Sequence, residues 1–145
     1  MTIAPLGPAD LDDVVAVARD AFAAPWTREA FAAELSRELA MSRALRVDGS
    51  LVAYVIAWAL GGELEILSIA TAVSAQRRGH ARHLLASLLD EARARGVTRA
   101  FLEVRADNMA AIALYRSLGF RDAGRRAGYY ADDTDAVLMA WAPAT

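Results

Sequence analysis

The alternation of apolar and polar residues in the first third of the chain predicts a short strand followed by two helices. The strand is expected at residues 2–6. Pro8-Ala9-Asp10 then starts a helix, because proline and acidic residues both suit a first helical turn. Pro25-Trp26 interrupts the helical pattern, and Thr27 is a suitable cap for a second helix that continues to Leu35. The expected apolar face of the first helix is Leu11, Val14, Val15, Ala18 and Phe22.

Three apolar runs in the middle of the chain predict three strands, at residues 44–47, 51–59 and 64–73. Asp48-Gly49 separates the first two runs and is typical of a hairpin turn. Gly61-Gly62 supplies the turn into the third strand.

A long amphipathic helix is expected from about Gly79 to Arg95, and Gly96 ends it. A strand follows at residues 100–105. The buried face of the helix is predicted to be Leu84, Leu85, Leu88, Leu89 and Ala92.

The last third of the chain predicts a shorter helix at residues 108–118, closed by Gly119, and two strands near residues 120–125 and 136–141. The complete order is β-α-α-β-β-β-α-β-α-β-β. The strand–helix–strand unit over residues 64–104 predicts a parallel pair, and the other connections predict antiparallel hairpins. We therefore expect an α/β (α+β) fold with a mixed, mainly antiparallel sheet, helices on both faces, and a single domain over residues 1–145.

Composition narrows the class of protein. Hydrophobic residues make up 56% of the chain, which is typical of a folded domain, and the formal charge of −2 gives no reason to expect direct binding of nucleic acid. The absence of cysteine excludes disulfides and a thiol nucleophile. His80 and His83 have no evident third ligand, so no metal site is expected. The N-terminus lacks the regions of a signal peptide, and the longest apolar run is too short to span a bilayer, so we expect a cytoplasmic protein with no membrane partner.

The stretch from Gln76 to Arg82 carries three arginines at the start of the long helix. A helix N-terminus already bears partial positive charge, so Arg77, Arg78 and Arg82 are electrostatically misplaced unless an anion binds there. Free backbone N–H groups and Gly79, which permits close approach, would then cradle a phosphate. The alternative is that the arginines are simply solvated and the glycine only forms a turn.

Several stretches together resemble one known family. Gln76-x-x-Gly79-x-Ala81, together with the order of elements, resembles the GNAT acetyltransferase superfamily over essentially the whole chain. Within it, three stretches look like the bacterial ribosomal-protein-alanine N-acetyltransferases of the RimI type. They are Pro25-Trp26-Thr27-Arg28-Glu29-Ala30-Phe31, then Leu102-Glu103-Val104-Arg105-Ala106-Asp107-Asn108 with Ala110-Ala111-Ile112-Ala113-Leu114-Tyr115, then Gly119-Phe120 with Tyr129-Tyr130.

The resemblance implies that acetyl-CoA is the anion that binds. Its pyrophosphate would lie on the segment of Arg77, Arg78, Gly79, His80, Ala81 and Arg82. Its pantetheine arm would pair with the strand edge at Ile69, Ala70 and Thr71, and Asn108 would also contact it. The family usually has a glycine where Ala81 stands, and alanine is small enough to keep the backbone accessible.

Glu103 and Tyr115 are the candidate catalytic residues. A carboxylate inside a strand is unusual, and burial raises the pKa of a carboxyl group. From the strand alone, an ion pair of Glu103 with Arg105 is as good an interpretation as catalysis. Tyr115 lies on the same side of its helix as Asn108. From helix geometry alone, an aromatic core residue is the more common interpretation of Tyr115, and Asn108 also fits the position of a helix cap. The resemblance makes Glu103 the base and Tyr115 the acid that protonates the leaving thiolate, with an oxyanion donor near Ala70.

Tyr129 and Tyr130 are candidate substrate-binding residues. In similar N-terminal acetyltransferases this loop closes over the first residues of the acceptor, and Asp132, Asp133 and Asp135 would give it an acidic rim that attracts a cationic peptide N-terminus. An exposed hairpin loop with two packing tyrosines is the alternative. The resemblance implies acetylation of the N-terminus of a ribosomal protein that begins with alanine. The alternatives are transfer to a small-molecule amine or a lysine side chain, and a non-catalytic acyl-CoA-binding module.

Overall fold

The computed structural model describes residues 1–143, and its elements occur in the predicted order. The last two residues of the predicted domain lie outside this description. The strands are β1 (Thr2–Pro5), β2 (Arg43–Val47), β3 (Ser50–Leu60), β4 (Glu63–Thr71), β5 (Arg99–Arg105), β6 (Arg121–Arg126) and β7 (Ala136–Trp141). The helices are α1 (Leu11–Ala21), α2 (Arg28–Leu35), α3 (His80–Ala94) and α4 (Met109–Ser117), with short 3-10 turns at Pro8–Asp10 and Val73–Ala75.

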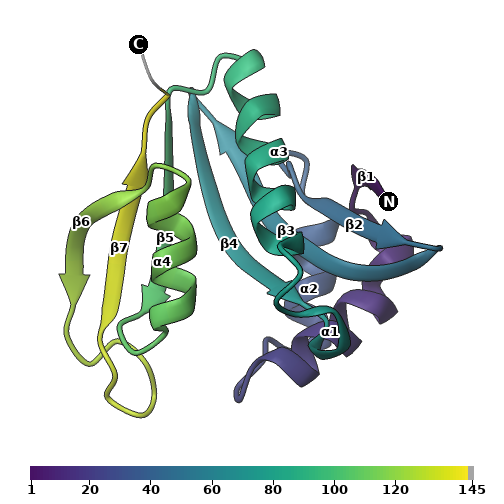
Figure 1. Cartoon of the computed structure of the whole chain (residues 1–145), viewed down its shortest axis with the longest axis horizontal. Helices are drawn as coiled ribbons and strands as arrows, with labels where there is room; N and C mark the ends of the chain where they lie inside the picture. The colour runs from purple at the N-terminus through teal and green to yellow at the C-terminus, as the bar shows by residue number, and fades with distance from the viewer. Residues whose placement is uncertain (144–145) are drawn as a thin grey trace.

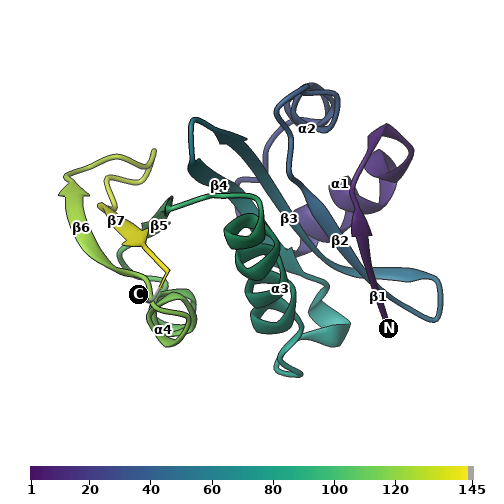
Figure 2. The ribbon, with the colours of Figure 1, turned by 90° about the horizontal axis from the view of Figure 1, so that it is seen from above.

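The strands form one mixed sheet, as the sequence predicts. Their order is β1-β2-β3-β4-β5-β7-β6, and β4 and β5 are the parallel pair while the other neighbours are antiparallel. α1 and α2 cover one face of the sheet and α3 and α4 cover the other (Figures 1 and 2). The chain thus builds two apolar layers around a single sheet.

Each face of the sheet has its own core. On the α3 side, the predicted helix face of leucines packs against alternate residues of β3, β4 and β5, such as Val55, Leu64 and Leu102. On the α1 side, Val14 and Phe31 pack against Tyr54 and Ile56 of β3. Because successive residues of a strand point to opposite faces, Glu103 and its neighbours Phe101 and Arg105 face the α1 side.

β4 and β5 pair only at one end. Their register joins Glu63–Ile66 to 99–102, and beyond Ile66 the two strands diverge (Figure 1). Residues 67–71 therefore keep β3 as a neighbour on one side and have no β5 partner on the other. The β3–β4 register also shifts between Ile56 and Ala57, a bulge that leaves Leu67 unpaired. An open strand edge thus lies in the middle of the sheet.

Local sequence signals explain several boundaries. The Oγ1 of Thr27 accepts a hydrogen bond from the amide of Ala30 at 3.1 Å, which confirms it as a helix cap. Asp48 and Gly49 have φ of 51° and 81°, the combination that a two-residue hairpin turn of type I′ requires.

Two details of the prediction are wrong. Phe22 is not on the face of α1, because the helix ends at Ala21 and Phe22 is extended and 38% exposed. The strand predicted to reach residue 73 ends at Thr71, because Val73 starts a 3-10 turn and lies largely in solvent.

Candidate active site

The start of α3 has the features of an anion site. Gly79 is its N-cap with φ of 77°, and among the described residues no side chain caps the helix and no acid lies in its first turn. A Cβ added at Gly79 would meet nothing within 4 Å, so the backbone there is open to solvent. Arg77, Arg78 and Arg82 are exposed around it, and Arg77 also has a positive φ of 67°. Unpaired N–H groups, helix dipole and guanidinium groups together favour a phosphate.

Two side chains tie this helix start to its neighbours. The guanidinium of Arg82 donates to the hydroxyl of Ser117 on α4. The Nε2 of Gln76 donates to the carbonyl of Thr71 at 3.4 Å, at the end of the open edge of β4. Arg82 therefore links α3 to α4 rather than standing free, and the helix start lies next to the strand edge at Ile69, Ala70 and Thr71.

Glu103 is exposed, which corrects the expectation of a buried carboxylate. Its Oε1 lies 3.2 Å from the Nε of Arg126 on β6. The predicted pair with Arg105 is also wrong, because Arg105 is engaged elsewhere. Glu103 is thus a solvent-accessible carboxylate on the α1 face, held by a cation that the sequence did not indicate.

Arg105 fastens the β6–β7 loop to β5. Its guanidinium donates to Asp107 at 3.1 Å, to Asp132 at 2.6 Å and to the hydroxyl of Thr134 at 3.1 Å. The hydrogen bond from Arg105 lowers the pKa of Asp132 to about 2. The same guanidinium stacks on the ring of Tyr130, 5.0 Å from its centroid. One arginine therefore sets the position of the loop next to Glu103.

Tyr129 and Tyr130 lie where the sequence predicts a substrate-binding loop. Their rings are perpendicular, with centroids 5.2 Å apart, and Arg126 lies over Tyr129. Tyr129 is exposed and Tyr130 is half-buried. Burial, and then the charge of Glu103, raise the pKa of Tyr130.

The ring of Tyr115 is buried in the core, while its hydroxyl is accessible to solvent. It is 6% exposed and packs edge-on against Phe120, with centroids 6.0 Å apart. Its hydroxyl has no hydrogen-bond partner within the described chain. Because every fully buried side-chain polar atom of the described residues has a partner, this oxygen is not fully buried and reaches solvent. Burial, followed by the neighbouring Tyr130, raises its pKa, and the phenol therefore stays protonated across the ordinary pH range.

Tyr130 is tied to the strand of Glu103, because its ring stacks on Arg105, two residues along β5 from Glu103. The charge of Glu103 contributes to the raised pKa of Tyr130, and Tyr130 contributes to that of Tyr115. Asn108, one of the predicted cofactor-binding residues, is the N-cap of α4. It is exposed, and its Oδ1 caps α4 by accepting from the amide of Ala111 at 3.1 Å.

The acidic rim predicted for the β6–β7 loop is largely neutralised. Asp132 pairs with Arg105, and Asp135 pairs with Arg125 at 2.8 Å, so Asp133 is the rim residue left without an ion pair in the part of the chain that is described. Arg126 and Arg105 were missed as site residues. Their partners lie on other strands or in a loop, and which residues meet across a sheet depends on strand register.

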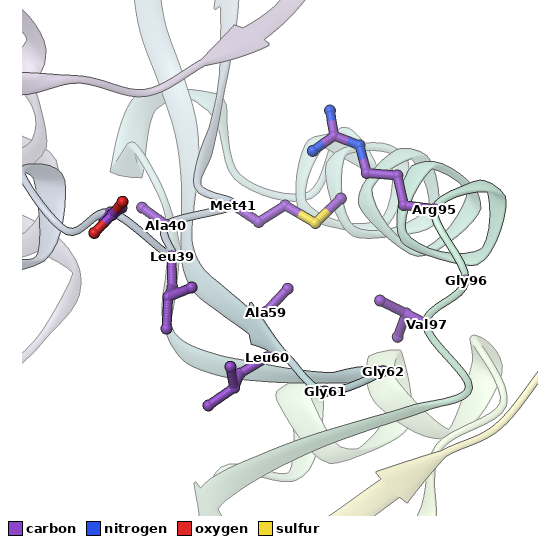
Figure 3. Close-up of a pocket in the computed structure, with 11 residues that line it drawn as sticks. Leu39, Ala40, Met41, Ala59, Leu60, Gly61, Gly62, Arg95, Gly96 and Val97 are labelled. Carbon is purple, nitrogen blue, oxygen red and sulfur yellow. The ribbon is translucent and has the colours of Figure 1, made fainter.

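An open pocket of about 360 Å³ lies away from this cluster, at the opposite ends of β4 and α3 (Figure 3). It is lined by residues such as Leu39, Leu60 and Arg95 and contains none of the predicted site residues. Over residues 1–143, no helix has the length and apolar character to cross a bilayer, and no group of three or more His, Cys, Asp or Glu side chains is arranged to hold a metal.

Comparison with known proteins connects this geometry to a family. The profile described as the acetyltransferase (GNAT) family matches residues 11–120. The [ribosomal protein bS18]-alanine N-acetyltransferase of Escherichia coli K12 is 39% identical over 142 residues, which cover 96% of this chain and 95% of that protein. The N-alpha-acetyltransferase RimI of Mycobacterium tuberculosis is 42% identical over 120 residues, 79% of this chain and 74% of the relative. The crystal structure of the E. coli ribosomal-protein-S18-alanine N-acetyltransferase superposes with a TM-score of 0.95 at 38% identity and covers 99% of this chain and 94% of that one.

Proposed function

Because this chain belongs to the acetyltransferase (GNAT) family, we propose that it transfers the acetyl group of acetyl-CoA to the N-terminal α-amine of a protein, with alanine-initiated ribosomal protein bS18 as the acceptor. The uncapped start of α3 beside the open edge of β4 carries the proposal, because together they can receive the pyrophosphate and the pantetheine arm of acetyl-CoA. The similarity to bS18-alanine N-acetyltransferases over almost the full chain supports the choice of acceptor.

In the proposed complex, the N-terminus of α3 holds the pyrophosphate of acetyl-CoA. The uncapped amides that follow Gly79 donate to it, and Arg77 and Arg78 balance its charge. The unpaired edge at Ile69, Ala70 and Thr71 receives the amide groups of the pantetheine arm as an added strand would. Asn108, at the start of α4, contributes a further contact.

Glu103 is the proposed base. An α-amino group has a pKa of about 8, so most of it is protonated at pH 7 and must lose a proton before its nitrogen attacks the thioester carbonyl. Glu103 takes this proton, directly or through a water molecule, from its exposed position on the α1 face. A backbone N–H near Ala70 is the proposed donor to the carbonyl oxygen as the C–N bond forms.

Tyr115 is the proposed acid. As the C–S bond breaks, the sulfur leaves as a thiolate that needs a proton. The Tyr115 hydroxyl is protonated, accessible and free of a hydrogen-bond partner among the described residues, so it is available to donate. The nitrogen loses its second proton to water as the tetrahedral intermediate collapses to the amide. Bulk water then reprotonates Tyr115 and takes the proton from Glu103, so that one proton is released overall.

The acceptor enters over Tyr129 and Tyr130 on the α1 face. Arg126 and Arg105 hold the two rings at the entrance. These rings would accommodate the extended N-terminal segment of an acceptor protein more readily than one of its internal loops. We also propose that residues 1–145 act as a single domain in the cytoplasm.

Thiol release from acetyl-CoA, measured with a panel of acceptors, tests the proposal. We expect turnover with a peptide that starts with a free alanine and none with the same peptide blocked at its N-terminus. Release with the blocked peptide would indicate a lysine acceptor, and release only with small amines would indicate a small-molecule acetyltransferase. Binding of acetyl-CoA without turnover on any acceptor would indicate a non-catalytic module.

A further inference from the structure

Glu65 of β4 is a carboxylate on the acceptor face for which the proposed chemistry gives no role. It lies opposite Trp58 on β3 and opposite Phe101 on β5, so two aromatic residues flank it across the sheet. Residues paired across neighbouring strands point to the same face. Phe101 alternates with the core residue Leu102, so Glu65 faces the α1 side together with Glu103.

Glu65 has no partner in the described structure. It forms no ion pair and no hydrogen bond with any described residue, although it is half-buried. Each of the two rings that flank it carries a cation of its own. Arg37 stacks on Trp58 at 5.6 Å and Arg99 stacks on Phe101 at 4.9 Å. Partial burial of a carboxylate without a cationic partner costs free energy, so Glu65 is available to bind a cation from another molecule.

The position of Glu65 relative to Glu103 follows from the strands. Glu65 pairs with Phe101, and Glu103 is two residues further along β5. Strand spacing and rise put the two Cα atoms roughly 8 Å apart. Burial, and then the charge of Glu103, raise the pKa of Glu65, which is the effect expected of two carboxylates that share one region. The acceptor face therefore carries two neighbouring acids, and only Glu103 has a cation of its own.

We propose that Glu65 determines specificity, by binding a lysine or arginine at the second or third residue of the acceptor. This rests on the proposed N-terminal acetylation. When the α-amine lies at Glu103, the next residues of an extended chain follow at a rise of about 3.3 Å each. A long cationic side chain at either position spans the distance to Glu65. The aspartates of the β6–β7 loop do not offer this, because Asp132 and Asp135 are already paired.

The test compares peptides that begin with alanine and differ only in the second or third residue, which is lysine, glutamine or glutamate. Wild-type protein is expected to acetylate the best lysine peptide about fivefold more efficiently in kcat/KM than the glutamine peptide, the effect of one partly exposed ion pair. The difference should lie in KM. In Glu65→Gln the ratio should fall to about one, because the lysine peptide loses the carboxylate that binds it.

Two further variants complete the design. Asp90→Asn removes one negative charge from an exposed position on α3, on the other face of the sheet, and should keep the wild-type preference. Glu65→Lys should prefer the glutamate peptide. Equal use of all peptides by wild type, or an unchanged preference in Glu65→Gln, would overturn the inference and leave N-terminal acetylation intact. No N-terminal product from any peptide would overturn the proposed function itself.

Discussion

Arg126 of β6 and Glu103 of β5 form an ion pair across the intervening strand β7, with 3.2 Å between Nε and Oε1. The same guanidinium lies over the ring of Tyr129. One arginine therefore holds both the proposed base and a residue of the acceptor loop. Replacing it should disturb the geometry of the reaction more than it disturbs the fold.

Arg126→Gln is expected to lower kcat/KM about two- to tenfold and to leave the melting temperature nearly unchanged, because exposed ion pairs contribute only about 0.2–1 kcal/mol to stability. Arg121→Gln is the matched control, since Arg121 is an arginine of the same strand that pairs with no described residue. Steady-state kinetics and thermal unfolding of both variants check this. Equal activity of the two variants would show that the ion pair does not position Glu103.

Glu103→Gln and Tyr115→Phe should each lower kcat about 10²–10⁴-fold, the usual contribution of a positioned acid or base. Both changes keep the size of the side chain, so acetyl-CoA should still bind. Calorimetric titration with acetyl-CoA and single-turnover kinetics separate these two effects. Full turnover in either variant would remove that residue from the mechanism.

Gly79→Ala should weaken acetyl-CoA binding. Alanine in the left-handed conformation costs roughly 1 kcal/mol of stability, and a methyl group at this open position would obstruct the approach of a phosphate to the helix start. Gly49→Ala is the matched control, because Gly49 also has a positive φ of 81° and open space around it but lies in the β2–β3 turn. Both variants should lose similar stability, and only Gly79→Ala should lose affinity.

The sequence predicted most of the fold because its signals are local. A threonine before a helix, an Asp-Gly turn and leucines at helical spacing each act over a few residues, and all three are found as expected. The site was predicted only in part. Glu103, Tyr115 and Tyr130 were identified through the family resemblance, and the structure adds that Arg105, two residues from Glu103, stacks on the ring of Tyr130.

The partners of the site residues could not be predicted because they depend on register. The β5–β7 and β6–β7 registers bring Arg126 to Glu103, and the β6–β7 loop brings Asp132 to Arg105. The β4–β5 register places Glu65 near Glu103, and the short extent of this pairing opens the edge that follows. The identity of a residue within a strand does not indicate which residue will lie opposite it on the neighbouring strand.

The pair of Arg43 and Glu91 should be the most costly ion pair to break. Both nitrogens of the Arg43 fork bind the Glu91 carboxylate, and the two side chains are 9% and 33% exposed. Glu91→Gln leaves the buried Arg43 guanidinium without a negatively charged partner and should destabilise the protein by about 1–3 kcal/mol. Its neighbour Asp90, exposed and without a described ion-pair partner, is the control, and Asp90→Asn should change stability by less than about 0.5 kcal/mol. Denaturant unfolding at pH 7 measures both.

Stability should fall in alkaline solution partly because of Tyr54. This residue is fully buried, its hydroxyl is 2.9 Å from that of Ser68, and burial raises its pKa from 10.0 to about 12. The unfolded chain ionises first, so the stability from Tyr54 is complete below pH 10 and is lost as the pH rises towards 12. The loss amounts to roughly 2–3 kcal/mol.

Tyr54→Phe should be less stable than wild type by about 0.5–1.5 kcal/mol at pH 7 and should lose less stability between pH 9 and 12. Unfolding by urea over this pH range gives both quantities. A constant difference between the two proteins at every pH would contradict the assignment.

The central claim concerns the atom that receives the acetyl group. Unacetylated ribosomal protein bS18 is incubated with acetyl-CoA and the purified protein, and the product is fragmented in a mass spectrometer. A single acetyl group on the α-nitrogen of the N-terminal alanine is the predicted result. An acetyl group found only on lysine side chains, or no acetylation while acetyl-CoA binds normally, would contradict it.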